Sequence, residues 1–419
     1  MRIKRSLILF ALLGFLGSRA LADVFPDEEG FDRYGGYLSI KGEATGRFHL
    51  EQIDGRHFLV TPEGHGFLSI GVTHTGGLVR PEGSGHDYFK DECAGDWKKA
   101  NQDIVSYFRA WGYNCVGYGG HETTRELLPH FASGHPSGKV SLWMGKAVEF
   151  PDVFGDEWKE QARSDIRKTL QKYDLESPKL IGIYWTDMPA WELEQARRTV
   201  GKTWVDAIRE LPESAPGRIR YERFRRERGE EASDEAFLRL IARQVYSTIG
   251  PFTRQLAPDT LIFGERYAGR ALPWGVIQEA LPYIDVVSVQ PNGTTFATVP
   301  FERLYQETGK PVMICDHSIS FRTPEHPKVM WDTLPDAGSV GRAYEVYLNE
   351  GFSTPYLIGY NRCQYINRFK NRQNMLKQGL LKEDGTPYEE FVEWLEKTNW
   401  GIHEKFVKSV ETRKGNLSD

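Results

Sequence analysis

Short apolar segments recur along this chain, and several of them run directly into polar residues. Residues 180–191, LIGIYWTDMPAW, pass from a mostly apolar run into Asp187, and residues 311–321, PVMICDHSISF, end in Asp316 and His317. A continuous apolar run of this kind is typical of a parallel strand covered on both faces. In an α/β barrel the carboxyl ends of the strands carry the functional residues, so we expect these two ends to contribute to one site.

Eight such segments alternate with helical stretches, which predicts the α/β class and a closed (β/α)₈ barrel, the TIM barrel. An open, doubly wound sheet is the alternative, but no G-x-G-x-x-G motif follows the first segment. In chain order, the expected strands lie within residues 66–77, 107–124, 139–154, 180–187, 260–269, 284–293, 311–321 and 353–368.

Two regions outside these strands also have readable patterns. Asp54-Gly55 lies between two alternating runs, which predicts a hairpin in a small N-terminal β element that closes the bottom of the barrel. Residues 192–258 are densely charged and are most simply interpreted as a pair of solvated helices in a long excursion between two strands.

The N-terminus has the pattern of an export signal. Basic residues precede an apolar run from Leu7 to Leu16, and the sequence A-L-A ends at Ala22. That run is too short to span a membrane comfortably, so we expect a secreted or periplasmic protein with no membrane partner. The expected divisions are a signal peptide at 1–22, an N-terminal β element at 23–66, the barrel at 67–400 and a C-terminal tail at 401–419.

Charge and cysteine usage exclude some classes. The chain has 53 basic and 58 acidic residues, a net charge of -5, which lacks the basic bias of a nucleic-acid-binding surface. Cys115, Cys315 and Cys363 fall within or beside expected strands, where apolar packing is favoured over a disulfide or a metal site. Nothing in these patterns indicates an oligomeric state.

Polar residues accumulate where the expected strands end. Carboxylates and amides hydrogen-bond hydroxyl groups, and an aromatic ring such as that of Trp185 stacks on a sugar face, so the set suits a polyhydroxylated substrate. Ordinary helix caps and loop residues are the alternative interpretation for each member, including Asp187 as the cap of the next helix. The candidates for substrate binding are His74, Tyr118, His121, Trp185, Arg266, Gln290, Asn292, Arg362 and Gln364.

Cofactor chemistry has little support in the sequence. There is no phosphate-binding glycine loop, and His74, His121 and His317 do not form an H-E-x-x-H motif or a comparably spaced set. We therefore expect neither a cofactor nor a metal ion.

Several segments together resemble the agarase-type glycoside hydrolases of family 50, within the large clan of retaining (β/α)₈ enzymes. They lie between about residues 40 and 370 and are GRHFLVTPEGHGFLSIGV, YWTDMPAW, IDVVSVQ, KPVMICDHSIS and YLIGYNRCQYINR. The resemblance implies a carbohydrate substrate, such as a marine galactan. It also implies an acid/base glutamate at the end of the fourth strand and a nucleophilic glutamate at the end of the seventh. In this chain Pro189 and Asp316 stand in those two places.

These departures leave two carboxylates for catalysis, Asp187 as acid and Asp316 as nucleophile or base, with Glu265 or His317 as alternative proton donors. Retaining hydrolysis needs carboxyl groups about 5–5.5 Å apart. Asp187 lies two residues before the usual acid position, and Asp316 is one methylene shorter than a glutamate. Both changes increase the distance between the two carboxyl groups, which favours an inverting geometry of about 6.5–9.5 Å. Neighbours on a strand point to opposite faces, so only one of Asp316 and His317 is expected to face the barrel mouth.

Two other functions remain open at this point. Arg266 or Arg362 could neutralise a sulfated or uronic sugar, and with His317 or Tyr118 as base the site could act as a uronic-sugar lyase. The alternative for both arginines is a surface or structural ion pair. Separately, the loss of both family glutamates leaves open a barrel that binds carbohydrate without catalysis, because binding needs no matched acid and base.

Overall fold

The structure is a computed structural model that describes residues 23–78, 86–136, 138, 140–269, 271–329, 333–369 and 375–408. The export signal predicted at residues 1–22 lies outside these described residues. Among the described helices, none has the length and apolar character that a membrane crossing requires.

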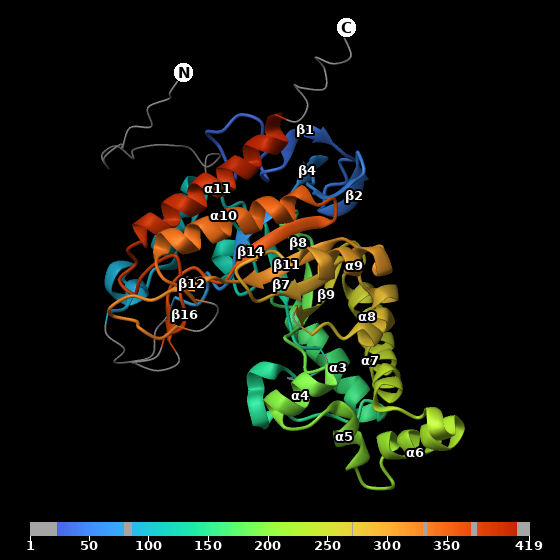
Figure 1. Ribbon diagram of the computed structural model, residues 1–419. Helices are drawn as coiled ribbons and strands as arrows, with labels where there is room; N and C mark the ends of the chain where they lie inside the picture. Colours follow the sequence, from blue (N-terminus) through green and yellow to red (C-terminus); the bar gives the residue numbers. More distant parts are fainter. Residues whose placement is uncertain are drawn as a thin grey trace.

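Eight parallel strands close into a barrel, which confirms the predicted fold (Figure 1). Helices surround the barrel and cover its outer surface, as expected for parallel strands that are apolar on both faces (Figure 1). The barrel strands are β5 (Ser69–Val72), β6 (Cys115–Val116), β7 (His130–Ser133), β8 (Leu180–Asp187), β9 (Leu261–Ala268), β10 (Val287–Gln290), β11 (Val312–His317) and β14 (Leu357–Arg362).

The third strand is not where the sequence pattern placed it. It is β7, which pairs with β6 and β8, whereas the expected segment at 139–154 contains the 3₁₀ helix η2 (Leu142–Ala147). Val140 and Leu142 of this segment are buried, as its apolar pattern predicted. They are buried outside the barrel sheet, where Ser141 forms an isolated bridge to Pro189 after β8. The true strand has only four residues, too few to show a period.

A four-stranded antiparallel sheet precedes the barrel, as predicted. Asp54 and Gly55 have φ angles of 51° and 78°, the left-handed values that a tight hairpin turn requires. Phe48 and Phe67 pack in one buried cluster with Ile181 and Ile358, which lie near the beginnings of their barrel strands, so the sheet closes that end of the barrel. Its strands, in spatial order, are β1 (Tyr37–Lys41), β4 (His65–Phe67), β3 (Arg56–Val60) and β2 (His49–Ile53).

The excursion after β8 is larger than the pair of helices that we expected. Figure 1 shows α4 to α6 projecting from one side of the barrel, while α7 runs back toward it. Phe237, Ile241 and Val245 of α7 are fully buried, because this helix has an apolar face as well as a charged one. The four helices are α4 (Leu193–Val200), α5 (Trp204–Arg209), α6 (Pro216–Arg228) and α7 (Asp234–Leu256).

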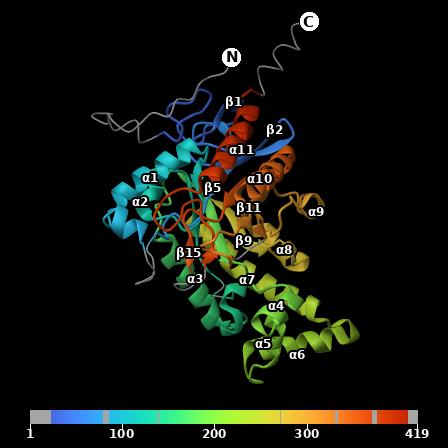
Figure 2. The same ribbon diagram turned by 60° about the vertical axis from the view of Figure 1, so that its left-hand side comes forward.

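The last two long helices lie side by side along one flank of the barrel (Figure 2). α11 also packs on β1, and it crosses the division expected at residue 400. The remaining helices are α1 (Trp97–Ala110), α2 (Glu122–Arg125), α3 (Asp156–Leu170), α8 (Trp274–Ala280), α9 (Thr298–Thr308), α10 (Ala337–Ser353) and α11 (Glu389–Lys408). Short elements are η1 (Tyr88–Glu92), η3 (Gly229–Glu231), η4 (Leu281–Tyr283), β12 (Ser320–Phe321), β13 (Thr333–Leu334), β15 (Arg368–Phe369) and β16 (Met375–Lys377).

Candidate active site

Asp316, at the end of β11, is held by side chains from three other parts of the barrel mouth. Its Oδ2 accepts hydrogen bonds from the Tyr118 hydroxyl and from Gln290 Nε2, the latter at 2.8 Å. The Lys377 Nζ lies 3.6 Å from the same oxygen. Asp316 is only 3% exposed, yet its Oδ1 has no hydrogen-bond partner among the described residues. One carboxylate oxygen is therefore fixed and the other is available.

The surrounding charges keep Asp316 ionised despite its burial. Burial alone raises the pKa of this carboxyl, but the positive charge of Lys377 and the proximity of His74 lower it, and the net pKa is below its usual range. Burial in turn lowers the pKa of Lys377, and the charge of Asp316 raises it to a net value above its usual range. The two side chains form a buried ion pair.

Arg266, at the end of β9, lies beside the same tyrosine. Its guanidinium carbon is 3.7 Å from the centroid of the Tyr118 ring, and its Nη2 is 3.7 Å from Asp187 Oδ2. The Nε and Nη1 atoms are buried, and neither has a hydrogen-bond partner among the described residues. A buried guanidinium with two unused donor nitrogens is suited to an anionic ligand.

Asp187 belongs to this group and does not cap the following helix. The cap of α4 is Glu192, whose side chain accepts from the backbone of Glu194 and Gln195. The side chain of Asp187 is 18% exposed, and its Oδ1 has no partner in the described part of the chain. The pKa of Tyr118 is raised first by burial and then by the charges of Asp316 and Asp187, so both carboxylates act on this tyrosine.

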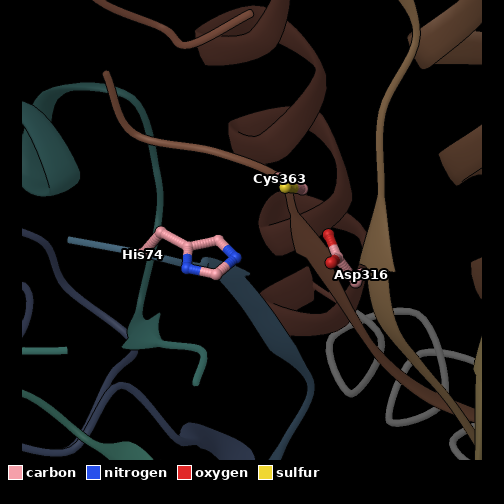
Figure 3. A group of neighbouring side chains, drawn as sticks. All are labelled: His74, Asp316 and Cys363. Atoms are coloured by element: carbon pink, nitrogen blue, oxygen red, sulfur yellow. The ribbon is translucent and has the colours of Figure 1, made fainter. Parts of the chain in front are cut away.

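His74 and Cys363 complete the group on the side of β5 and β14 (Figure 3). The His74 ring packs edge-on against Tyr118 with centroids 4.8 Å apart, and burial, followed by the charge of Lys377, lowers its pKa well below the usual value. Lys377 Nζ lies 3.1 Å from Cys363 Sγ, and burial raises the pKa of this thiol to about 12. Neither Lys377 nor Cys363 was among our site candidates. We expected Cys363 to be an apolar packing residue inside the segment 353–368, but it directly follows β14 and its sulfur contacts Lys377.

The two alternative proton donors lie on the outer side of the barrel wall. Glu265 accepts from Trp191 Nε1 and from the Tyr246 hydroxyl, the latter at 2.8 Å, between the barrel and α7. His317 lies 3.0 Å from the Tyr360 hydroxyl through Nδ1. Of the neighbours Asp316 and His317, only Asp316 faces the mouth, as the strand geometry predicted.

Four of the substrate-binding candidates, Trp185, His121, Arg362 and Gln364, pair or pack outside this group. Trp185 stacks on Tyr246 of α7, with ring centroids 6.0 Å apart, so it is a packing residue of the outer wall. His121 caps α2 and stacks on Trp97. The Arg362 guanidinium donates to Ser318 and lies over Phe391 of α11. Gln364 donates to the Ile366 carbonyl, and Asn292 lies in the loop after β10. The structure thus brings together Asp187, Asp316, His74, Tyr118, Arg266 and Gln290 from the predicted set.

Comparisons with known proteins place this fold. No protein-family description matches the sequence, and no curated protein matches it. Solved structures do match. An exo-β-agarase superposes with a TM-score of 0.76 at 18% identity, over 93% of this chain and 69% of that one. A second agarase gives a TM-score of 0.73 at 18% identity, over 95% and 71% of the two chains.

A β-galacturonidase of glycoside hydrolase family 2 from Eisenbergiella tayi, bound to galacturonate, gives a TM-score of 0.51 at 15% identity, over 85% of this chain and 54% of that one. The chain therefore shares the (β/α)₈ fold of these glycoside hydrolases. Its similarity to the family 50 agarases extends over nearly the whole chain, which confirms the resemblance seen in the sequence.

Proposed function

We propose that the protein is a glycosidase that cleaves an acidic polysaccharide or oligosaccharide, with Asp316 as nucleophile or base and Asp187 as acid. The observation that carries this proposal is the asymmetry of the Asp316 carboxylate. Its Oδ2 is held by Tyr118 and Gln290, while Oδ1 is buried and unpaired among the described residues. A fixed, ionised carboxylate with one available oxygen suits attack on an anomeric carbon or activation of a water.

An acidic sugar is favoured by the cations beside the two carboxylates. Arg266 presents buried donor nitrogens with no partner in the described chain, and Lys377 adds a second positive charge. A uronate or sulfate group would accept hydrogen bonds from the guanidinium and satisfy these donors. The fold is compatible with this substrate class, since the similar β-galacturonidase was crystallised with galacturonate.

Product release from a glycan panel tests the proposal. Neutral galactan, sulfated galactan and polymers of uronic acid are incubated with the purified chain, and new reducing ends are measured. We expect a gain on at least one acidic glycan and a smaller gain, or none, on the neutral one. Binding to these glycans without any gain of reducing ends would instead support a carbohydrate-binding barrel.

Elimination at a uronic sugar is the second candidate. Of the two bases considered for it, Tyr118 lies in the site and His317 does not, and the Arg266 guanidinium lies over the Tyr118 ring at 3.7 Å. Arg266 would neutralise the uronate while the Tyr118 oxygen removes the proton beside the carboxylate and passes its own hydroxyl proton to Asp316. The C4–O bond then breaks, a C4–C5 double bond forms, and the departing sugar oxygen takes a proton from water. This reaction forms an unsaturated product that absorbs in the near ultraviolet, and the same incubations distinguish it from hydrolysis.

Secretion belongs to the same proposal, because a polysaccharide is met outside the cell. N-terminal sequencing of protein recovered from the periplasm or medium is expected to begin just after Ala22, and a chain that retains the segment before it would contradict export by this signal.

A further inference from the structure

Three residues of different chemical type converge beside the proposed catalytic carboxylate. One ring nitrogen of His74, a carboxylate oxygen of Asp316 and Cys363 Sγ all lie within 4.8 Å of one another. Figure 3 shows the imidazole of His74 facing the carboxylate, with the sulfur beside them. We propose that His74, Asp316 and Cys363 form a binding site for one Zn²⁺ ion.

The donor set matches this ion. Thiolate and imidazole are the ligands that Zn²⁺ prefers, and a carboxylate commonly completes the set. Zinc bonds are about 2.0–2.3 Å long, so the three ligand atoms need to approach one another by roughly 1 Å when the ion binds. Such an approach is within the reach of side-chain rotation at three strand ends.

Two of the three residues each have a buried polar atom with unused hydrogen-bonding capacity. His74 Nε2 and Asp316 Oδ1 are both buried, and neither has a partner among the residues that the structure describes. Buried polar atoms of folded proteins are nearly always paired, so two unpaired atoms aimed into one cluster call for an explanation. A bound cation satisfies both at once.

Lys377 is compatible with an ion at this position. Asp316 and the thiolate of Cys363 together carry two negative charges, which balance the ion. The positive charge of Lys377 is additional, and the nearby Asp187 carboxylate also attracts it. The Lys377 ammonium lies 3.1 Å from Cys363 Sγ and can remain as a hydrogen-bond donor to the thiolate, the role that outer partners play at metal sites. Three protein ligands also leave a fourth position for water or a substrate oxygen.

A second group of potential metal ligands, Asp32, Glu63 and His65, already has hydrogen-bond and ion-pair partners within the protein. Asp32 Oδ2 in the N-terminal region already accepts hydrogen bonds from Thr61 and, at 2.9 Å, from His65. Glu63 of the same group pairs with Arg33 at 2.9 Å. Those side chains are paired with one another and with Arg33, so a metal ion is proposed only for the group at the barrel mouth.

The zinc site does not rest on the proposed glycosidase activity. A bound ion would occupy Asp316 Oδ1, the oxygen that the proposed reaction uses, so zinc is expected to inhibit hydrolysis. Binding is measured without any substrate, and a failure of one proposal therefore leaves the other standing.

Cobalt(II) titration of the full chain tests the site. The purified protein is stripped with a chelator and titrated with Co²⁺ alone, which gives a near-ultraviolet charge-transfer band only when a thiolate is a ligand. We expect one equivalent to bind with this band and to be displaced by Zn²⁺. Cys363→Ser is expected to abolish the band and to weaken binding by at least about 100-fold.

Two further variants make the result specific. Cys93→Ser removes a buried free cysteine at the end of η1, outside the cluster, and is expected to bind as the wild type does. His74→Asn removes the imidazole at a left-handed position with φ of 59°, which asparagine tolerates, and is expected to weaken binding even if Cys363→Ser does not fold. The absence of a band in the wild type, a band that persists in Cys363→Ser, or wild-type affinity in His74→Asn would overturn the site.

Discussion

Lys377 Nζ lies 3.6 Å from Asp316 Oδ2, which joins β16 to the end of β11 by a buried ion pair. Asp316→Asn leaves the buried ammonium without this carboxylate, so we expect a loss of about 3 kcal/mol in the free energy of unfolding at pH 7. The folded pKa of Asp316 is below its unfolded value of about 3.9. The contribution of the ion pair to the free energy of unfolding is therefore fully present above about pH 3.9. It is lost as the pH falls through the lower folded pKa.

Urea unfolding of wild type and Asp316→Asn between pH 7 and pH 3 measures this difference. The two curves are expected to converge toward the acidic end. A gap of constant size throughout the range, or a variant more stable than the wild type, would show that the ion pair does not stabilise the fold.

Glu265 is expected to matter for stability and not for chemistry. It is fully buried on the outer side of β9, where it accepts from Trp191 and Tyr246. Glu265→Gln keeps the size but replaces one acceptor oxygen by a donor, so we expect a loss of about 1–3 kcal/mol in unfolding free energy. Turnover by the folded variant should stay near that of the wild type, and a 100-fold fall in kcat at full folding would place Glu265 in the reaction.

Arg266 is expected to set the preference for acidic substrates. Arg266→Gln removes the guanidinium beside Asp187, and hydrogen bonds to charged groups contribute about 1.5–3 kcal/mol. We therefore expect kcat/KM on a uronic or sulfated glycan to fall about 10-fold to 100-fold, with a smaller change on a neutral glycan. Equal losses on both kinds of glycan would argue against anion recognition.

His403 is expected to make the fold sensitive to mild acid. Its Nε2 lies 2.9 Å from the Gly112 carbonyl and its Nδ1 3.0 Å from the Tyr37 hydroxyl, and burial lowers its pKa to about 4. The unfolded histidine titrates near 6.5. The contribution of neutral His403 to the free energy of unfolding is therefore fully present above about pH 6.5 and is lost as the pH falls toward 4. The full contribution is about 3 kcal/mol.

The matched variant is His403→Gln, which replaces the imidazole by a polar side chain that does not titrate. Its unfolding free energy is expected to vary less between pH 7 and pH 4.5 than that of the wild type, in which His130 also has a pKa lowered to about 4. An unchanged pH dependence would mean that His403 is not buried in its neutral form.

The sequence predicted the barrel well because buried parallel strands leave long apolar runs. It could not predict which side of a strand each polar residue faces, because irregularities interrupt the alternation. In β9 the register shifts against β8, and Gly264 has φ of 66°. This shift adds one residue to β9 relative to β8. Phe263 faces the barrel interior, so strict alternation would place Glu265 inside as well. The added residue instead turns Glu265 outward and Arg266 into the site.

A register shift in β11 between Ile314 and His317 also interrupts the alternation of side chains. As a result, Asp316 faces the barrel mouth. Lys377 was missed for a different reason. It comes from a two-stranded ribbon after the last barrel strand, where no period or motif marks the chain. Long-range placement of such a residue depends on tertiary packing, which one sequence does not display.

Asp316 and Asp187 are proposed to carry out glycoside hydrolysis. The most direct test is the single-turnover rate of Asp316→Asn and of Asp187→Asn on an acidic glycan that the wild type cleaves. Both variants keep the side-chain shape but lose the ionisable carboxyl group. With folding verified by circular dichroism, we expect each to lower the rate by about 10²-fold to 10⁴-fold or more, without a matching rise in the dissociation constant of the glycan. Near-wild-type turnover in both folded variants would contradict the account.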